Sequence, residues 1–172
     1  MDILARSSFI RRKDMDSVLN CLVTDKLGAG EFGDRFIKIA KERFGFEFGL
    51  LLRSPITALE LAVGCLGLLP GDAIALSALS QVWAYKAITA RGLRPVWLDV
   101  DSVSASLTST SLERLVSEPA KALYLAEPWG IMPDPAPLAE LGIPIVEDAT
   151  FSIGASSGEL RAGFLGTFGI LG

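Results

Sequence analysis

The sequence predicts an α/β fold in which a mostly parallel central sheet carries helices on both faces. Short apolar runs of strand length alternate with helical segments over about 100 residues, a pattern typical of parallel sheets with right-handed crossovers. Acidic residues follow or end several of the apolar runs, as at Asp99, Glu127 and Asp148. Hydrophobic residues make up 50% of the chain and charged residues 21%, so we expect a packed core and a single domain as the default.

The first part of the chain predicts two helices. Apolar residues recur at helical spacing over 14–23, and a second helix is expected over 34–44. Between them lies a literal match to the dinucleotide-binding pattern G-x-G-x-x-G, Gly28-Ala-Gly-Glu-Phe-Gly33. That pattern requires a preceding strand and a suitably placed acid, but the preceding segment looks helical and Glu47 falls within the next predicted strand. A glycine-rich turn into a helix is the favoured interpretation.

The rest of the chain predicts alternating strands and helices. Ser54 followed by Pro55 is a strong helix start, with the serine as N-cap and the proline at the first helical position. Strands are expected over 46–52, 73–76, 95–99, 122–126 and 143–148. Helices are expected over 54–68, 80–91, 111–117 and 134–141, the last closed by Gly142.

Composition excludes several classes of function. A net charge of −4 provides no basic surface for nucleic acid, and the longest apolar run is too short to cross a membrane. No signal peptide is recognised, and we expect Cys21 and Cys65 to be buried thiols of a cytoplasmic protein. The chain has no histidine, which excludes histidine triads and most catalytic zinc sites, so no metal site is predicted.

Asp148 is the leading candidate for a functional side chain. It ends the apolar run Ile143-Pro-Ile-Val-Glu-Asp148, and buried parallel strands deliver their last side chains to the edge of the sheet where ligands bind. The alternative is that Asp148 brackets the following turn, because aspartate is common at turns.

The last segment, 158–172, has glycines at positions 163, 166, 169 and 172. This spacing indicates strands or turns whose backbones pass closely. Its apolar residues need something to pack on, so we expect either that the chain is the front part of a longer protein or that a partner covers it.

From about residue 14 to its end, the chain resembles the DegT/DnrJ/StrS family of sugar-nucleotide aminotransferases, which are fold-type-I enzymes dependent on pyridoxal phosphate (PLP). The segments that carry the resemblance are Ser54-Pro-Ile-Thr-Ala-Leu-Glu-Leu-Ala, Gly71-Asp72, Gly92-Leu-Arg-Pro-Val-Trp-Leu-Asp-Val-Asp101, Trp129-Gly-Ile-Met-Pro-Asp134, Val146-Glu-Asp-Ala and Gly163-Phe-Leu-Gly-Thr-Phe-Gly169. The resemblance implies an α/β large domain, a homodimer with the active site at the subunit interface, and amino transfer to a keto-sugar nucleotide.

The resemblance also implies roles for single residues. Asp148 matches the aspartate that pairs with the pyridine nitrogen of PLP, where a carboxylate keeps the ring protonated and electron-withdrawing. The stretch from Ser54 to Thr57 lies where the family has its Ser-Gly-Thr phosphate loop. Pro55 removes an amide donor from that loop and Ile56 removes a hydroxyl, which Thr57 could partly replace.

Other positions depart from the family pattern. Gln81 stands where an aromatic residue stacks on the cofactor ring, Phe151 stands where the family has glutamine, and Glu127 replaces the usual histidine. No lysine in this chain matches the one that forms the internal Schiff base, so we assign no catalytic residue here.

Two hypotheses follow from the resemblance. In the first, residues 1–45 form an N-terminal helical arm and residues 46–172 an incomplete large domain, without the C-terminal small domain, of an aminotransferase that is inactive as this chain alone. In the second, the chain is a degenerate, non-catalytic dimeric binding or structural protein of the same fold. A Rossmann-type nucleotide-binding domain is a distant third. For the site, we predict that Asp148, Ser54 and Gln81 converge on one cleft.

Overall fold

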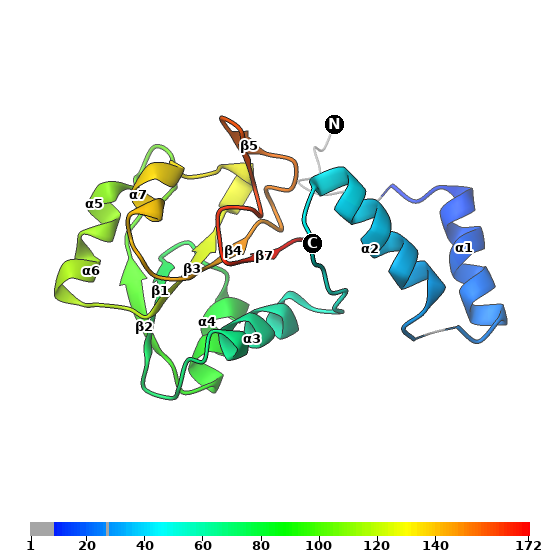
Figure 1. Ribbon diagram of the computed structural model, residues 1–172, viewed down its shortest axis with the longest axis horizontal. Coiled ribbons are helices and arrows are strands. Elements are labelled where there is room, and N and C mark those ends of the chain that lie inside the picture. Colours follow the sequence, from blue (N-terminus) through cyan, green and yellow to red (C-terminus); the bar gives the residue numbers. More distant parts are fainter. Residues whose placement is uncertain (1–8, 27) are drawn as a thin grey trace, which may run out of the picture. The chain divides into compact units, whose positions relative to one another are not determined.

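The computed structural model describes residues 9–26 and 28–172, so the first eight residues of the predicted arm lie outside the described part. The chain forms two compact units, Met1–Leu51 and Leu52–Gly172. The first unit contains helices α1 (Arg12–Val23) and α2 (Glu31–Phe44), both of which the sequence predicted (Figure 1). Gly45 ends α2 in the left-handed conformation, at φ +86°, which a glycine adopts without strain.

The element before the glycine-rich motif at 28–33 is helix α1, and Gly33 already lies inside α2. A dinucleotide-binding loop connects a strand to a helix. The observed order is helix, turn, helix, which agrees with the glycine-rich turn and excludes the Rossmann interpretation of this motif.

The strand predicted over 46–52 is wrong, because these residues form an irregular loop. Phe48 is 84% exposed and Leu50 is 67% exposed. A strand requires a neighbour that accepts and donates its backbone hydrogen bonds, and no strand of the described sheets pairs with this segment. The apolar composition alone therefore misled the sequence prediction.

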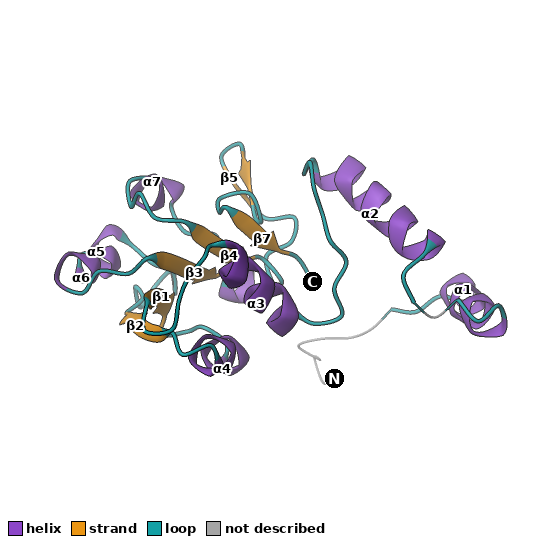
Figure 2. Cartoon of the chain, turned by 60° about the horizontal axis from the view of Figure 1, so that its bottom comes forward, coloured by secondary structure: helices purple, strands orange, loops and turns teal. Residues whose placement is uncertain are grey.

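The second unit contains a five-stranded sheet with the order β2-β1-β3-β4-β7, in which every neighbouring pair is parallel (Figure 2). The strands are β1 (Ala73–Ser77), β2 (Arg94–Leu98), β3 (Ala122–Ala126), β4 (Ile145–Asp148) and β7 (Phe168–Ile170). A separate antiparallel pair, β5 (Ser156–Ser157) and β6 (Leu160–Arg161), lies in the segment between β4 and β7. The predicted α/β class with a mostly parallel sheet is confirmed.

Helices cover both faces of this sheet, as two separate apolar clusters show. On one face, α3 (Pro55–Cys65) and α4 (Val82–Ala90) pack through Leu59, Val63 and Ile88 against the strands. On the other face are α5 (Ser109–Leu112), α6 (Arg114–Ser117) and α7 (Pro135–Ala139), with the buried Leu112 and Leu138 in the second cluster. Strands β1 and β3 are buried along their whole length, as expected for central strands of a doubly covered sheet.

The helix starts follow the predicted capping chemistry. The Ser54 hydroxyl accepts a hydrogen bond of 3.2 Å from the Ile56 amide at the start of α3, with Pro55 at the first helical position. Asp134 accepts from the Ala136 amide at 3.0 Å in the same way at the start of α7. Short polar side chains that precede a proline therefore define both helix starts.

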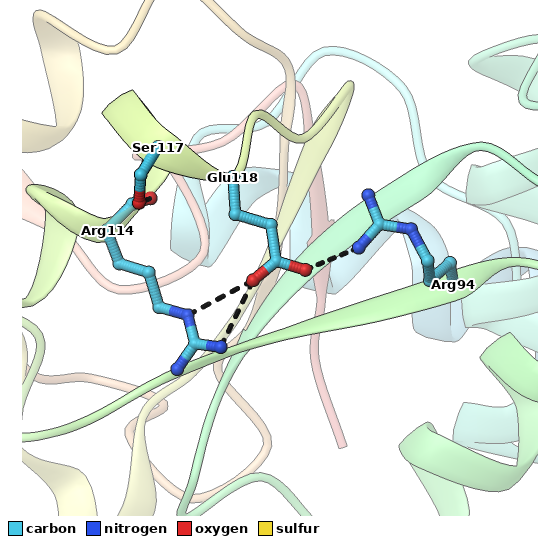
Figure 3. Close-up of polar contacts among 4 residues, drawn as sticks. All are labelled: Arg94, Arg114, Ser117 and Glu118. Carbon is cyan, nitrogen blue, oxygen red and sulfur yellow. Dashed lines mark hydrogen bonds and ion pairs between the residues drawn. The ribbon is translucent and has the colours of Figure 1, made fainter.

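An ion-pair cluster ties the edge strand β2 to helix α6. Glu118 accepts hydrogen bonds from Arg94, at the start of β2, and from Arg114, within α6 (Figure 3). These two guanidinium groups hold the pKa of Glu118 below its usual value, with Arg114 the larger influence. The cluster is exposed, so it contributes to local order more than to overall stability.

The cysteine prediction is wrong for Cys65, which is exposed, while Cys21 is only partly buried. Both lie in helices, as predicted, but Cys65 is at the last position of α3, beyond the buried stripe of that helix. Among the described residues, no helix is long and apolar enough to cross a membrane.

Candidate functional site

Three buried acidic residues lie at the ends of the neighbouring strands β3 and β4, on the two faces of the sheet. Glu127 follows β3, and Glu147 and Asp148 are the last two residues of β4. All three are buried, with exposed fractions of 1%, 0% and 2%, respectively. Burying charged groups is costly unless each has hydrogen-bond partners, so the partners of these acids define what this site can do.

Asp148 is held by one backbone amide and one phenol. The Tyr124 hydroxyl donates to Asp148 Oδ2 at 2.6 Å, and the Thr150 amide donates to Oδ1 at 3.1 Å. The same hydroxyl lies 3.2 Å from Gln81 Oε1, so Tyr124 joins two of the predicted site residues. Burial raises the pKa of the Tyr124 hydroxyl, and the neighbouring Asp148 raises it further, so Tyr124 stays protonated and acts as the donor.

Strand register explains why Tyr124 and Asp148 meet. Tyr124 pairs with Val146 and Ala126 pairs with Asp148, so these residues share the face of the sheet covered by α3 and α4. The Tyr124 ring also packs edge-to-face against Trp83 of α4, with ring centroids 6.1 Å apart. The phenol is therefore fixed by its strand, by an aromatic neighbour and by its hydrogen bond.

The interaction between Asp148 Oδ1 and the Thr150 amide spans two residues, as in an Asx-turn. Asp148 therefore brackets the next turn, as the alternative interpretation expected, and it also ends an internal strand of the sheet. Its predicted pairing with a pyridine nitrogen stays a prediction.

Ser54 and Thr57 have no hydrogen bond to the cluster around Tyr124 among the described residues. α3 packs against β4 and β7, and a short connection joins its C-terminal end to the start of β1. The Ser54 end of α3 therefore lies toward the edge of the sheet where the strands end. The Ser54 hydroxyl serves as the N-cap of α3, and within the described part of the chain it forms no hydrogen bond to Asp148 or Gln81. The structure thus brings Gln81 and Asp148 together, while convergence of Ser54 with them stays a prediction.

Thr57 is on the outer face of α3. It borders a shallow groove of about 380 Å³, lined by Thr57, Glu60, Leu61, Gly64, Cys65 and Arg91. Phe151 is 39% exposed in the turn that follows β4. The predicted cofactor contacts of Thr57 and Phe151 stay predictions.

Glu147 has a role that sequence reasoning missed. Its side chain points to the opposite face of the sheet from Asp148, and it accepts hydrogen bonds from three backbone amides of the glycine-rich segment. Gly163 donates to Oε1 at 2.7 Å, and Leu165 and Gly166 donate to Oε2 at 2.7 and 3.2 Å. Glu147 therefore anchors the segment that leads into β7. An acid inside an otherwise apolar strand was the available signal.

Glu127 is the least satisfied of the three acids. Its Oε2 accepts from the Ser152 hydroxyl, while Oε1 is buried without a hydrogen-bond partner. Burial raises the pKa of Glu127 to about 8, and the neighbouring Glu147 and Asp148 act in the same direction. This environment favours the protonated form of Glu127 at neutral pH. Among the described residues, no group of three or more acidic or cysteine side chains is arranged to hold a metal ion.

Comparison with known proteins gives the family. The model of the DegT/DnrJ/EryC1/StrS aminotransferase family matches residues 9–172, nearly the whole chain. The chain belongs to this family. Its fold class and the resemblance in its sequence motifs agree with that membership.

The names of similar curated relatives specify nucleotide-linked sugars. The GDP-perosamine synthase of Caulobacter vibrioides is 28% identical over 167 residues, which are 92% of this chain and 45% of the relative. The dTDP-4-dehydro-2,3,6-trideoxy-D-glucose 4-aminotransferase of Saccharopolyspora spinosa is 28% identical over 92% of this chain and 42% of its own length. The chain thus spans less than half the length of these relatives.

Solved structures of the same fold include PLP-bound proteins. The aminotransferase TlmJ from Streptoalloteichus hindustanus has a TM-score of 0.82 at 28% identity, covering 92% of this chain and 45% of that one. An E. coli GDP-4-keto-6-deoxy-D-mannose-3-dehydratase with bound hydrated PLP has a TM-score of 0.86 at 24% identity, covering 95% and 44%, and supports the fold alone.

The residues at the positions that the resemblance assigns to PLP already have partners within the chain or depart from the family pattern. Protein groups already bond to both oxygens of Asp148, and the carboxylate is 2% exposed. Gln81, at the position where the resemblance implies a stacking aromatic residue, accepts a hydrogen bond from the Tyr124 hydroxyl. At the start of α3, Pro55 has no N–H to offer a phosphate.

Proposed function

We propose that this chain is a non-catalytic member of the sugar-nucleotide aminotransferase family, with the family fold but without a working PLP site. The observation that carries this proposal is the 2.6 Å hydrogen bond from Tyr124 to Asp148, the acid that the resemblance assigns to the cofactor. The altered stacking position, Gln81, and the altered phosphate loop at Pro55 support it independently.

On this proposal the protein acts by binding rather than by amino transfer. We propose that it forms a homodimer in the cytoplasm, since α1 exposes a row of apolar residues that a second copy would bury. Sugar nucleotides are the first ligand class to examine, because the names of the similar relatives specify substrates of that class.

The test is incubation of the purified full-length protein with PLP, followed by gel filtration and absorbance measurement. We expect no retained absorbance in the PLP bands and no new circular dichroism there. Borohydride reduction, which traps Schiff bases, should add no covalent cofactor. Saturable PLP binding that is lost in Asp148→Asn would overturn the proposal.

A second candidate is a PLP-dependent sugar-nucleotide aminotransferase in which the remainder of a longer protein supplies the Schiff-base lysine. Asp148 favours it, because it ends a central strand and is oriented by the Thr150 amide. Stable borohydride-trapped PLP on the full-length protein would select this candidate. Unmodified protein after reduction would select the first.

A further inference from the structure

Tyr124 places an aromatic ring and a hydrogen-bond donor directly against Asp148. Its hydroxyl has one proton, and the shorter of its two contacts is the 2.6 Å bond to Asp148 Oδ2, against 3.2 Å to Gln81. A pyridinium N–H would have to donate to a carboxylate oxygen of the same aspartate. Tyr124 is fully buried and Asp148 is only 2% exposed, so the phenol, and not solvent, covers Asp148 Oδ2.

The phenol cannot easily move away. Tyr124 is in the middle of β3, which pairs with β1 on one side and β4 on the other, and its ring packs against Trp83. If the phenol moved away, the buried Asp148 Oδ2 would lose its hydrogen-bond donor, because the Thr150 amide bonds to the other oxygen, Oδ1. The arrangement is therefore a property of the central sheet and not of a loop.

We propose that Tyr124 is a built-in occupant of the Asp148 site, supplying from within the chain both the hydrogen-bond donor and the aromatic volume that a pyridinium ring would bring. This inference rests on the proposed non-catalytic function and gives it a specific cause. It assigns Tyr124, rather than the changes at Gln81 or Pro55 alone, as the residue that closes the site to PLP.

The test uses full-length protein carrying Gln81→Phe, which restores an aromatic stacking residue, with and without Tyr124→Val, which removes the phenol. PLP is titrated and followed by the circular dichroism induced in its absorption bands. We expect no signal from the unmodified protein or from Gln81→Phe alone, and saturable binding by Gln81→Phe/Tyr124→Val. Adding Asp148→Asn should weaken that binding about tenfold or more, since a charge-assisted hydrogen bond is lost.

Two results overturn the inference. One is equal PLP binding by Gln81→Phe with and without the Tyr124 change; the other is a folded double variant that binds no PLP. Binding by the unmodified protein would instead reject the proposed function, so the two failures are distinguishable.

If the double variant does not fold, an NMR measurement on the unmodified protein still tests the inference. The Tyr124 hydroxyl proton should give a downfield, slowly exchanging proton NMR signal, which Tyr124→Phe removes and Asp148→Asn moves upfield. A hydroxyl proton that exchanges rapidly with water would contradict the built-in occupancy.

Discussion

Glu127 shows at the scale of one residue how burial controls charge. Its Oε1 has no partner and its neighbours are two further acids, so the native state holds a proton on Glu127 that the unfolded chain releases. Because the folded pKa of about 8 is above the ordinary value of 4.5, the native state binds more protons between these values. The contribution of Glu127 to the free energy of unfolding therefore falls as the pH rises from about 4.5 to about 8.

Glu127→Gln should remove this pH dependence, because glutamine mimics the neutral acid at every pH. We expect the variant to be more stable than the unmodified protein at pH 8, by on the order of 4 kcal/mol, and to differ little at pH 4.5. Urea unfolding between pH 4.5 and 8 measures this. Glu159→Gln, at an exposed position, is the matched control and should keep the original slope.

Tyr124 was absent from the sequence-based list of site residues, although a signal existed. A tyrosine within a central strand of alanine and leucine needs a buried hydrogen-bond partner for its hydroxyl. Side chains alternate between the two faces of a strand, but only the β3–β4 register shows that Tyr124 and Asp148 lie on the same face of the sheet. The sequence could therefore predict that a partner exists, but not which one.

At the scale of elements, Glu147 connects strand β4 to the glycine-rich segment before β7. The segment is also tightly fitted, since a Cβ at Gly166 would lie 2.6 Å from the carbonyl oxygen of Ile145. The glycine spacing was interpreted as close backbone approach, and the contacts at Gly166 agree with that interpretation.

Glu147→Ala should leave the amides of Gly163, Leu165 and Gly166 without their acceptor. We expect a loss of stability on the order of 3 kcal/mol, with a smaller loss for Glu147→Gln, which keeps one acceptor oxygen. Hydrogen exchange should show faster exchange at these amides in both variants. Unchanged exchange rates in Glu147→Ala would mean that other contacts hold the segment.

At the start of α3, the helix-capping role of Ser54 can be tested separately from a role in ligand binding. Since its hydroxyl caps the helix at Ile56, Ser54→Ala should cost about 1 kcal/mol in chemical denaturation even with no ligand present. Thr57→Ala, on the outer face of the same helix, should change stability much less. Equal losses in the two variants would count against the capping role.

At the scale of the whole molecule, the exposed apolar row of α1 bears on assembly. Met15, Val18, Leu19 and Leu22 recur at helical spacing and are each 54–60% exposed. Such a row is typical of a helix that packs against another surface. The resemblance to a dimeric family makes a second copy the proposed surface.

We expect light scattering to give a mass near twice that of the 18.3 kDa chain, and Leu19→Lys/Leu22→Lys to shift it toward the monomer. Ser17→Lys/Asn20→Lys adds the same charge on the polar face of α1 and should leave the mass unchanged. A monomeric unmodified protein at every concentration would reject the homodimer.

The sequence by itself determined the fold class, the parallel strands around 122–126 and 143–148, and the helix starts at Ser54 and Asp134. These depend on local patterns: apolar runs of strand length and capping side chains next to proline. It failed at 46–52, because an apolar run becomes a strand only if a neighbour supplies its backbone partners.

Only the tertiary structure decided what surrounds Asp148. The sequence placed this acid at the end of an internal strand, but its partner Tyr124 lies 24 residues away in the chain. Gln81, which contacts the same Tyr124 hydroxyl, lies 43 residues from Tyr124. Strand order and register bring them together, and neither can be read from local pattern. The physical reason is that the hydrogen bonds of a buried carboxylate depend on which donors the packed sheet places beside it.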